Sequence, residues 1–187
     1  IACLPPTVSY NHPTQNGHEI DLTWRSDTIG FAPGSYSIAD EANRKKNSRE
    51  DLAFSAFAGD GLKFLISQLK AAGVPANVGV VARSIGQADG LPVRSMLFYN
   101  GEFGSEVVLN SNQTILNDQP ASFTIQQGQR IGNPELAALR AYCLMHNLEA
   151  HLSNSGVSLP FDRQYKLSTT SKVGAAFRTA QISFIIR

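Results

Sequence analysis

Alternating apolar and polar positions predict β-strands in several parts of the chain. Residues 20–24 alternate in this way, and residues 28–31 follow just before Pro33, so we expect either one bent strand or two short strands there. A β-branched run at residues 76–82 predicts a further strand that ends in a polar turn. Residues 181–186 predict a closing strand.

Apolar residues at helical spacing predict two helices. The first covers residues 61–72, after Asp60 as a candidate N-cap. The second covers residues 134–153, begins with Pro134 in its first turn, and places Cys143 where a small buried hydrophobic residue is expected. Because these helices lie between strands, the pattern predicts an α/β sandwich of helices against one sheet.

Residues 90–132 interrupt the alternation of strands and helices. Three strand-like pieces, at residues 95–99, 106–110 and 122–126, are separated by turn-forming residues. We therefore expect one domain over residues 20–187 that carries a β-rich insertion at about residues 90–132.

Composition narrows the possible partners. The chain has 187 residues, 42% of them hydrophobic, and a formal net charge of +1, which gives no broad cationic surface. Nucleic acid is therefore not an expected partner. The sequence contains no apolar run of the length that crosses a bilayer.

The first 19 residues differ in character from the rest. Cys3 follows a small residue and an aliphatic one, which resembles the end of a bacterial lipoprotein signal, where the thiol receives lipid after cleavage. Residues 4–17 contain prolines and turn formers without a sustained period, as a flexible tether does. Residues 1–19 are thus expected to be a lipid anchor and tether. The alternative is that Cys3 is an ordinary cysteine.

Sequence motifs give no support to catalysis or to a metal centre. The chain has no glycine-rich phosphate loop and no nucleophile elbow. His146 and His151 are five positions apart, which does not place them on one helical face. We expect a non-enzymatic protein with no cofactor and no metal.

The second predicted helix carries a family resemblance. Residues 133–141, read with residues 152–157, resemble the helix of OmpA-like C-terminal domains, whose pattern is Asn-x-x-Leu-Ser-x-x-Arg-Ala followed by Leu-x-x-x-Gly-Val. The strand at residues 78–82 and the closing segment at residues 174–186 are similar to the strands on either side of that helix. The resemblance implies an α+β sandwich in β-α-β-α-β-β order, with the helices packed on one mixed sheet.

The resemblance also implies a ligand. In that family an aspartate and the helix arginine hold a diaminopimelate residue of peptidoglycan, and here Arg140 falls on the arginine position. The acidic position falls on Ile85, and Asp89 is the nearest carboxylate. For Arg140 the alternative is that it braces neighbouring loops.

Three interpretations of the sequence remain open at this point. The first is an outer-membrane lipoprotein on the periplasmic face, a structural component of an envelope-spanning, secretion-type assembly. Other envelope proteins would be its partners, and the insertion would dock one of them by strand addition. The second is a peptidoglycan-binding module that tethers the outer membrane to the cell wall. The third is an unrelated α/β domain.

Overall fold

A computed structural model gives the architecture. It describes residues 9–10, 22–25, 28–38, 63, 67, 80–93, 97–154, 156 and 160–186. Cys3 and most of the helix predicted at residues 61–72 lie outside these residues, although Lys63 and Ser67 are helical.

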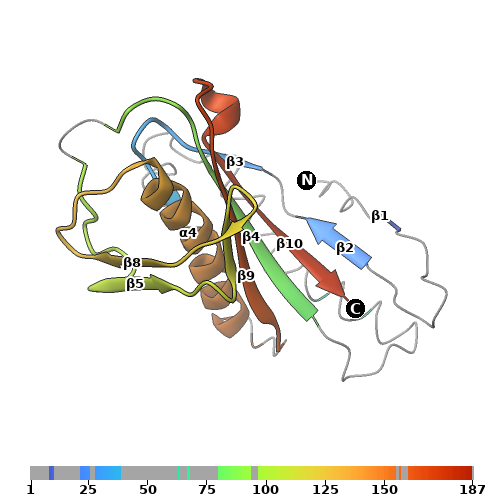
Figure 1. Cartoon of the computed structure of the whole chain (residues 1–187). Helices are drawn as coiled ribbons and strands as arrows, with labels where there is room; N and C mark the ends of the chain where they lie inside the picture. The colour runs from blue at the N-terminus through green and yellow to red at the C-terminus, as the bar shows by residue number, and fades with distance from the viewer. Residues whose placement is uncertain are drawn as a thin grey trace.

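One mixed sheet organises the molecule (Figure 1). Its eight described strands run in the order β1-β2-β10-β4-β9-β6-β7, with β3 also pairing with β10. The strands are β1 (Ser9–Tyr10), β2 (Leu22–Arg25), β3 (Ile29–Gly30), β4 (Val80–Ala88), β6 (Thr114–Leu116), β7 (Gln119–Pro120), β9 (Asp162–Thr169) and β10 (Thr179–Ile186). β4 is antiparallel to β10 and parallel to β9. The fold class is therefore α+β, with a mixed sheet, as the sequence predicts.

Helix α4 (Asn133–Asn154) covers one face of the sheet (Figure 1). Its bounds differ by one residue at each end from the predicted ones. The side chain of Glu135 accepts a hydrogen bond from the N–H of Gly132 at 2.9 Å, and the Asn133 amide donates to the carbonyls of Asp89 and Leu91. These bonds fix the start of the helix against the end of β4.

Small residues let β4 and α4 approach closely. The Ser84 hydroxyl donates to the carbonyl of Ala141 at 2.7 Å, so the helix backbone lies directly on the strand. A Cβ added at Gly86 would stand 2.2 Å from the carbonyl oxygen of Ala137. This contact explains why the helix-facing side of β4 carries small residues, Ala82, Ser84, Gly86 and Ala88.

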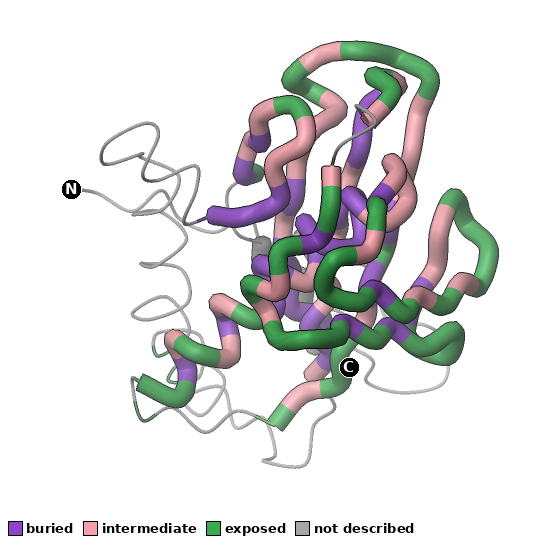
Figure 2. Tube along the Cα trace, turned by 90° about the vertical axis from the view of Figure 1, so that its left-hand side faces the viewer, coloured by how far each residue is buried: buried purple, intermediate pink, exposed green. Residues whose placement is uncertain are grey.

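The insertion contributes to two sheets. β5 (Glu106–Leu109) and β8 (Phe123–Gln126) pair with each other in a separate two-stranded sheet, close to the predicted strands. Between them in the chain, β6 and β7 join the main sheet, where β6 lies parallel to β9. Along β5 and β8 buried positions alternate with more exposed ones, so one face of the small sheet is buried. Figure 2 colours the described chain by this burial.

A strand was predicted at residues 95–99, of which the structure describes residues 97–99. For these residues the prediction of a strand is wrong. Residues 97–99 form no strand, and Phe98 makes a single bridge to Arg130. Backbone hydrogen bonds also join Leu97 to Ile131 and Tyr99 to Gln129, and Gly101 and Gly128, with φ of 86° and 81°, turn the two segments at the end where this pairing stops.

Two further expectations need correction. The strand expected to end near residue 82 continues to Ala88. Buried and partly buried positions alternate along it to the end, as in a strand, but the buried ones are small rather than strongly apolar. The segment expected to be a tether contributes Ser9–Tyr10 to the sheet, since backbone pairing with β2 does not require a strong local pattern. β6, β7 and β9 were not predicted.

Within the part of the chain that the structure describes, no helix has the length and apolar character needed to cross a membrane.

Candidate functional site

Arg140 lies inside the protein and bonds to backbone carbonyls. Its side chain is fully buried, at 0% exposure. Nε donates to Ser35 O at 2.8 Å, Nη1 to Gln87 O at 2.7 Å and Nη2 to Ala32 O at 3.2 Å. The guanidinium carbon also lies 5.2 Å from the centre of the Phe31 ring. Arg140 therefore ties the segment after β3 to the end of β4.

Asp89 is the first residue after β4, and it too is buried, with 4% exposure. Its Oδ2 accepts hydrogen bonds from Arg178 Nη1 at 2.7 Å and from the N–H of Gly174 at 3.1 Å. Arg178 Nε donates in turn to Phe31 O at 3.2 Å. The pair thus joins the end of β4, the loop before β10 and the segment that Arg140 also holds.

The charge of Asp89 is stabilised by these donors. Burial by itself raises the pKa of the carboxyl group. The hydrogen bonds from the Gly174 N–H and from Arg178, together with the positive charge of Arg178, outweigh burial and hold the pKa of Asp89 below its ordinary value of 3.8. The carboxylate therefore favours the folded state at neutral pH.

Arg140 and Asp89 both lie at one end of the sheet. They are buried, and they form hydrogen bonds with other groups rather than with each other. Arg140 donates to the carbonyl of Gln87, two positions before Asp89, yet the hydrogen bonds of Asp89 come from Arg178 and Gly174. The arrangement corresponds to the bracing role left open for Arg140. Ile85, on which the family's acidic position falls, lies within β4.

Sequence reasoning missed the part that Asn133 plays at this end of the molecule. Its side-chain amide donates to the backbone carbonyl of Asp89 at 2.9 Å, so the first residue of α4 holds the backbone of Asp89 at the end of β4. Asn133 donates here to backbone carbonyls outside the helix, and such acceptors leave no signal in the sequence.

An aromatic cluster fastens the insertion to α4. The ring of Phe103 lies 5.5 Å from both Tyr142 and His146, and Tyr142 stacks at 6.4 Å on Tyr165. Burial is the first cause that raises the pKa of Tyr165. No group of three or more histidine, cysteine or acidic side chains that could hold a metal occurs among the described residues.

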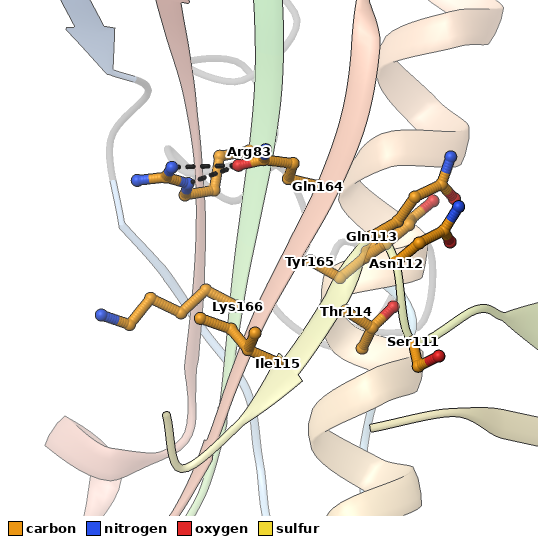
Figure 3. A pocket seen from close by; sticks show the side chains of 9 residues that line it. All are labelled: Arg83, Ser111, Asn112, Gln113, Thr114, Ile115, Gln164, Tyr165 and Lys166. Atoms are coloured by element: carbon orange, nitrogen blue, oxygen red, sulfur yellow. Dashed lines mark hydrogen bonds between the residues drawn. The ribbon is translucent and has the colours of Figure 1, made fainter. Parts of the chain in front are cut away.

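A separate pocket of about 220 Å³ opens beside β6 and β9 (Figure 3). Arg83 donates from Nε and Nη2 to the side-chain oxygen of Gln164, at 3.2 and 2.9 Å. In Figure 3 the Arg83 and Lys166 side chains extend to one side, and the Asn112 and Gln113 amides to the other. The full lining is Arg83, Ser111, Asn112, Gln113, Thr114, Ile115, Gln164, Tyr165 and Lys166.

Comparison of the chain with protein-family models, with curated proteins and with solved structures found no match. The OmpA-like resemblance of residues 133–157 therefore stays a prediction from the sequence.

Proposed function

We propose that this chain is a non-enzymatic lipoprotein held at the periplasmic face of the outer membrane through lipid on Cys3. Its OmpA-like domain acts as a structural component of an envelope-spanning, secretion-type assembly. The partners are other proteins of that assembly, and the insertion supplies the contact surface.

The observation that carries this proposal is the engagement of Arg140 and Asp89 within the protein. Each makes short hydrogen bonds to its own fold, and each is at most 4% exposed. A zwitterionic ligand held by both residues would have to replace these bonds and open a buried region. The two residues therefore support a role in holding the fold together rather than in binding a ligand.

The outer edge of β5 supports a protein partner. Gln127 N–H donates to Ser105 O at 2.8 Å, so the backbone groups of Ser105 and Val107 face β8. Those of Glu106 and Val108 consequently point away from β8, and no described strand pairs with them. Val108 is 47% exposed on the same strand. An open edge of this kind accepts an added strand.

Blocking this edge tests the proposal. In Val108→Pro the lost N–H is one that points outward, and edge strands tolerate proline there, so we expect unfolding free energy to change by less than about 1 kcal/mol. We expect the variant to leave the high-mass complex that the wild-type chain enters, as measured by native gel electrophoresis of detergent-solubilised envelopes.

Val108→Thr is the matched control, because it keeps the N–H and a β-branched side chain. It should enter the complex like the wild type. Undiminished incorporation of the proline variant would count against a partner at this edge. A wild-type chain that enters no complex would overturn the assembly role itself.

Peptidoglycan binding is the alternative function, and one observation favours it. β4 runs to Ala88, so Asp89 stands directly at the end of the strand that resembles the one before the family's acidic motif. Isolated sacculi, titrated with the full chain, distinguish the two functions. The assembly proposal expects no saturable binding. Binding that free diaminopimelate displaces and that a folded Asp89→Asn variant lacks would establish the alternative instead.

A further inference from the structure

β9 has a free edge along its first three residues. It pairs with β4 from Asp162 to Thr169, but its pairing with β6 begins only at Tyr165. Within the described chain, no strand lies on that side of residues 162–164. The turn at residues 111–113, which leads into β6, lines a pocket next to this stretch without pairing with it as a strand.

The backbone groups at this edge point outward. Tyr165 N–H donates to Gln113 O on the β6 side at 2.8 Å, whereas Thr170 N–H donates to Ala88 O on the β4 side at 3.2 Å. Because successive residues of a strand face opposite neighbours, the N–H and C=O of Arg163 point to the β6 side, where no described strand pairs with them. They can bond to an added chain without displacing a bond already present in the described structure.

The pocket beside β6 and β9 lies at the same place and has a cationic lining. Arg83 and Lys166 are among its nine lining residues, and none of the nine is acidic. Its volume of about 220 Å³ is below the roughly 300–1,000 Å³ of pockets for whole small molecules, so it suits one residue of a longer chain. An occupant with a carboxylate matches both the size and the charge.

Details of the lining favour a peptide over an acidic sugar. The Tyr165 ring is 4% exposed and presents no flat face on which a sugar ring would stack. The Thr114 hydroxyl is buried with no hydrogen-bond partner, which leaves a polar group at the pocket unused. Gln164 already orients the Arg83 guanidinium.

We name the edge at residues 162–164, together with the adjoining pocket, the notch. We propose that this notch binds an extended acidic peptide segment of a protein partner. The segment adds as a strand beside residues 162–164 and pairs with the backbone of Arg163. Its carboxylate side chain reaches Lys166 and Arg83. The inference rests on the proposed assembly role and names one of its contact sites.

Two acidic residues lie near this site, and one of them provides a variant for the test. Asp118 Oδ1 lies 3.7 Å from Lys166 Nζ, and the Asp118 side chain is 82% exposed. An incoming carboxylate would therefore compete for Lys166 only with a weak surface ion pair. Asp162 is exposed and shares the strand face of Gln164. The carboxylate of Asp162 would repel an acidic segment. The Asp162→Asn variant should therefore bind such a segment more tightly than the wild type.

The probe is the peptide acetyl-Thr-Glu-Val-Glu-Thr-amide, titrated into the ¹⁵N-labelled full chain and followed by amide chemical shifts. We expect saturable shifts centred on Arg163 and Gln164. Replacing both glutamates by glutamine, or making the Lys166→Gln variant, should weaken binding by about tenfold each, as loss of a charge-assisted bond does. Asp162→Asn should strengthen binding about threefold. Lys172→Gln, a change of the same charge elsewhere on the surface, should leave it unchanged.

Three results would overturn the inference. The first is no binding of the peptide, and the second is equal binding by wild type and Lys166→Gln. The third is binding of oligogalacturonate, used as an acidic sugar probe, in place of the peptide. If the peptide fails while the chain still enters the envelope complex, this site is wrong and the proposed function stands. If the peptide binds while the chain enters no complex, the failure belongs to the proposed function.

Discussion

Arg140 holds two distant parts of the chain through one planar group. Three of its hydrogen bonds reach the carbonyls of Ala32 and Ser35 on one side and of Gln87 on the other. A guanidinium offers five N–H donors in a fixed fork, whereas a lysine offers a single nitrogen on a flexible stem. The position therefore depends on the shape of the side chain as much as on its charge.

Substitution of Arg140 should destabilise the fold. In Arg140→Met the buried carbonyls lose their donors, and we expect the free energy of unfolding to fall by about 3 kcal/mol or more. Arg140→Lys should lie between Met and the wild type. Urea denaturation at pH 7 measures both, with exposed Arg130→Met as a control expected to stay within about 0.5 kcal/mol. A fully stable Met variant would contradict the bracing role.

Asp89 should make stability depend on pH in acid. Its folded-state pKa lies below 3.8, so its contribution is present above that pH and is lost as pH falls through the lower, folded value. Asp89→Asn should therefore cost about 2 kcal/mol at pH 7, and its difference from the wild type should shrink below pH 3.8. Urea denaturation at several pH values checks this, with exposed Asp118→Asn as a control. A difference that is the same at every pH would argue against the ion pair.

At the scale of elements, the packing of α4 on β4 depends on the absence of a side chain. A methyl group at Gly86 would overlap Ala137 O, so Gly86→Ala should lower the free energy of unfolding by about 1–3 kcal/mol. Gly30→Ala is the matched control, because nothing lies within 4 Å of a Cβ there. Thermal denaturation compares the two, and an equally stable Gly86→Ala protein would show that helix and strand can move apart without cost.

A helix or strand could be predicted from the sequence where its pattern of apolar residues is long. A strand was harder to predict where the strand with which it pairs is distant in the chain. The apolar spacing of α4 persists over many turns and gives its bounds to within one residue. β9 was missed although Tyr165 and Leu167 alternate inward, because its outward positions are polar and it begins with charged residues. Its place in the sheet comes from pairing with β4, about 80 residues earlier in the chain, which no local pattern records.

The candidate site shows the same limit. Arg140 and Asp89 were singled out through the OmpA-like resemblance, as a pair that would hold peptidoglycan, and bracing of neighbouring loops was left open for Arg140. The sequence did not indicate the groups that Arg140 contacts in the fold, because the carbonyls of Ala32 and Ser35 lie more than 100 positions away from it. Backbone acceptors carry no residue identity and leave no signal in a sequence.

For the whole molecule, the proposed attachment to a membrane depends on Cys3. Acyl chains on that thiol would supply a membrane affinity that a chain of net charge +1 does not obtain from electrostatics. We expect Cys3→Ser to move the protein from the membrane fraction to the soluble fraction without changing its unfolding midpoint. Mass spectrometry of the native protein should detect the added lipid, and unmodified Cys3 in membrane-bound protein would rule out this anchor.

The path of the insertion has a mechanical consequence. The chain leaves β5, crosses into the main sheet as β6 and β7, and only then returns as β8. A pull on the small sheet is therefore transmitted along β6 to β9, and from β9 to β4 in the centre of the molecule. A partner attached at this end would thus apply its load to the core of the fold.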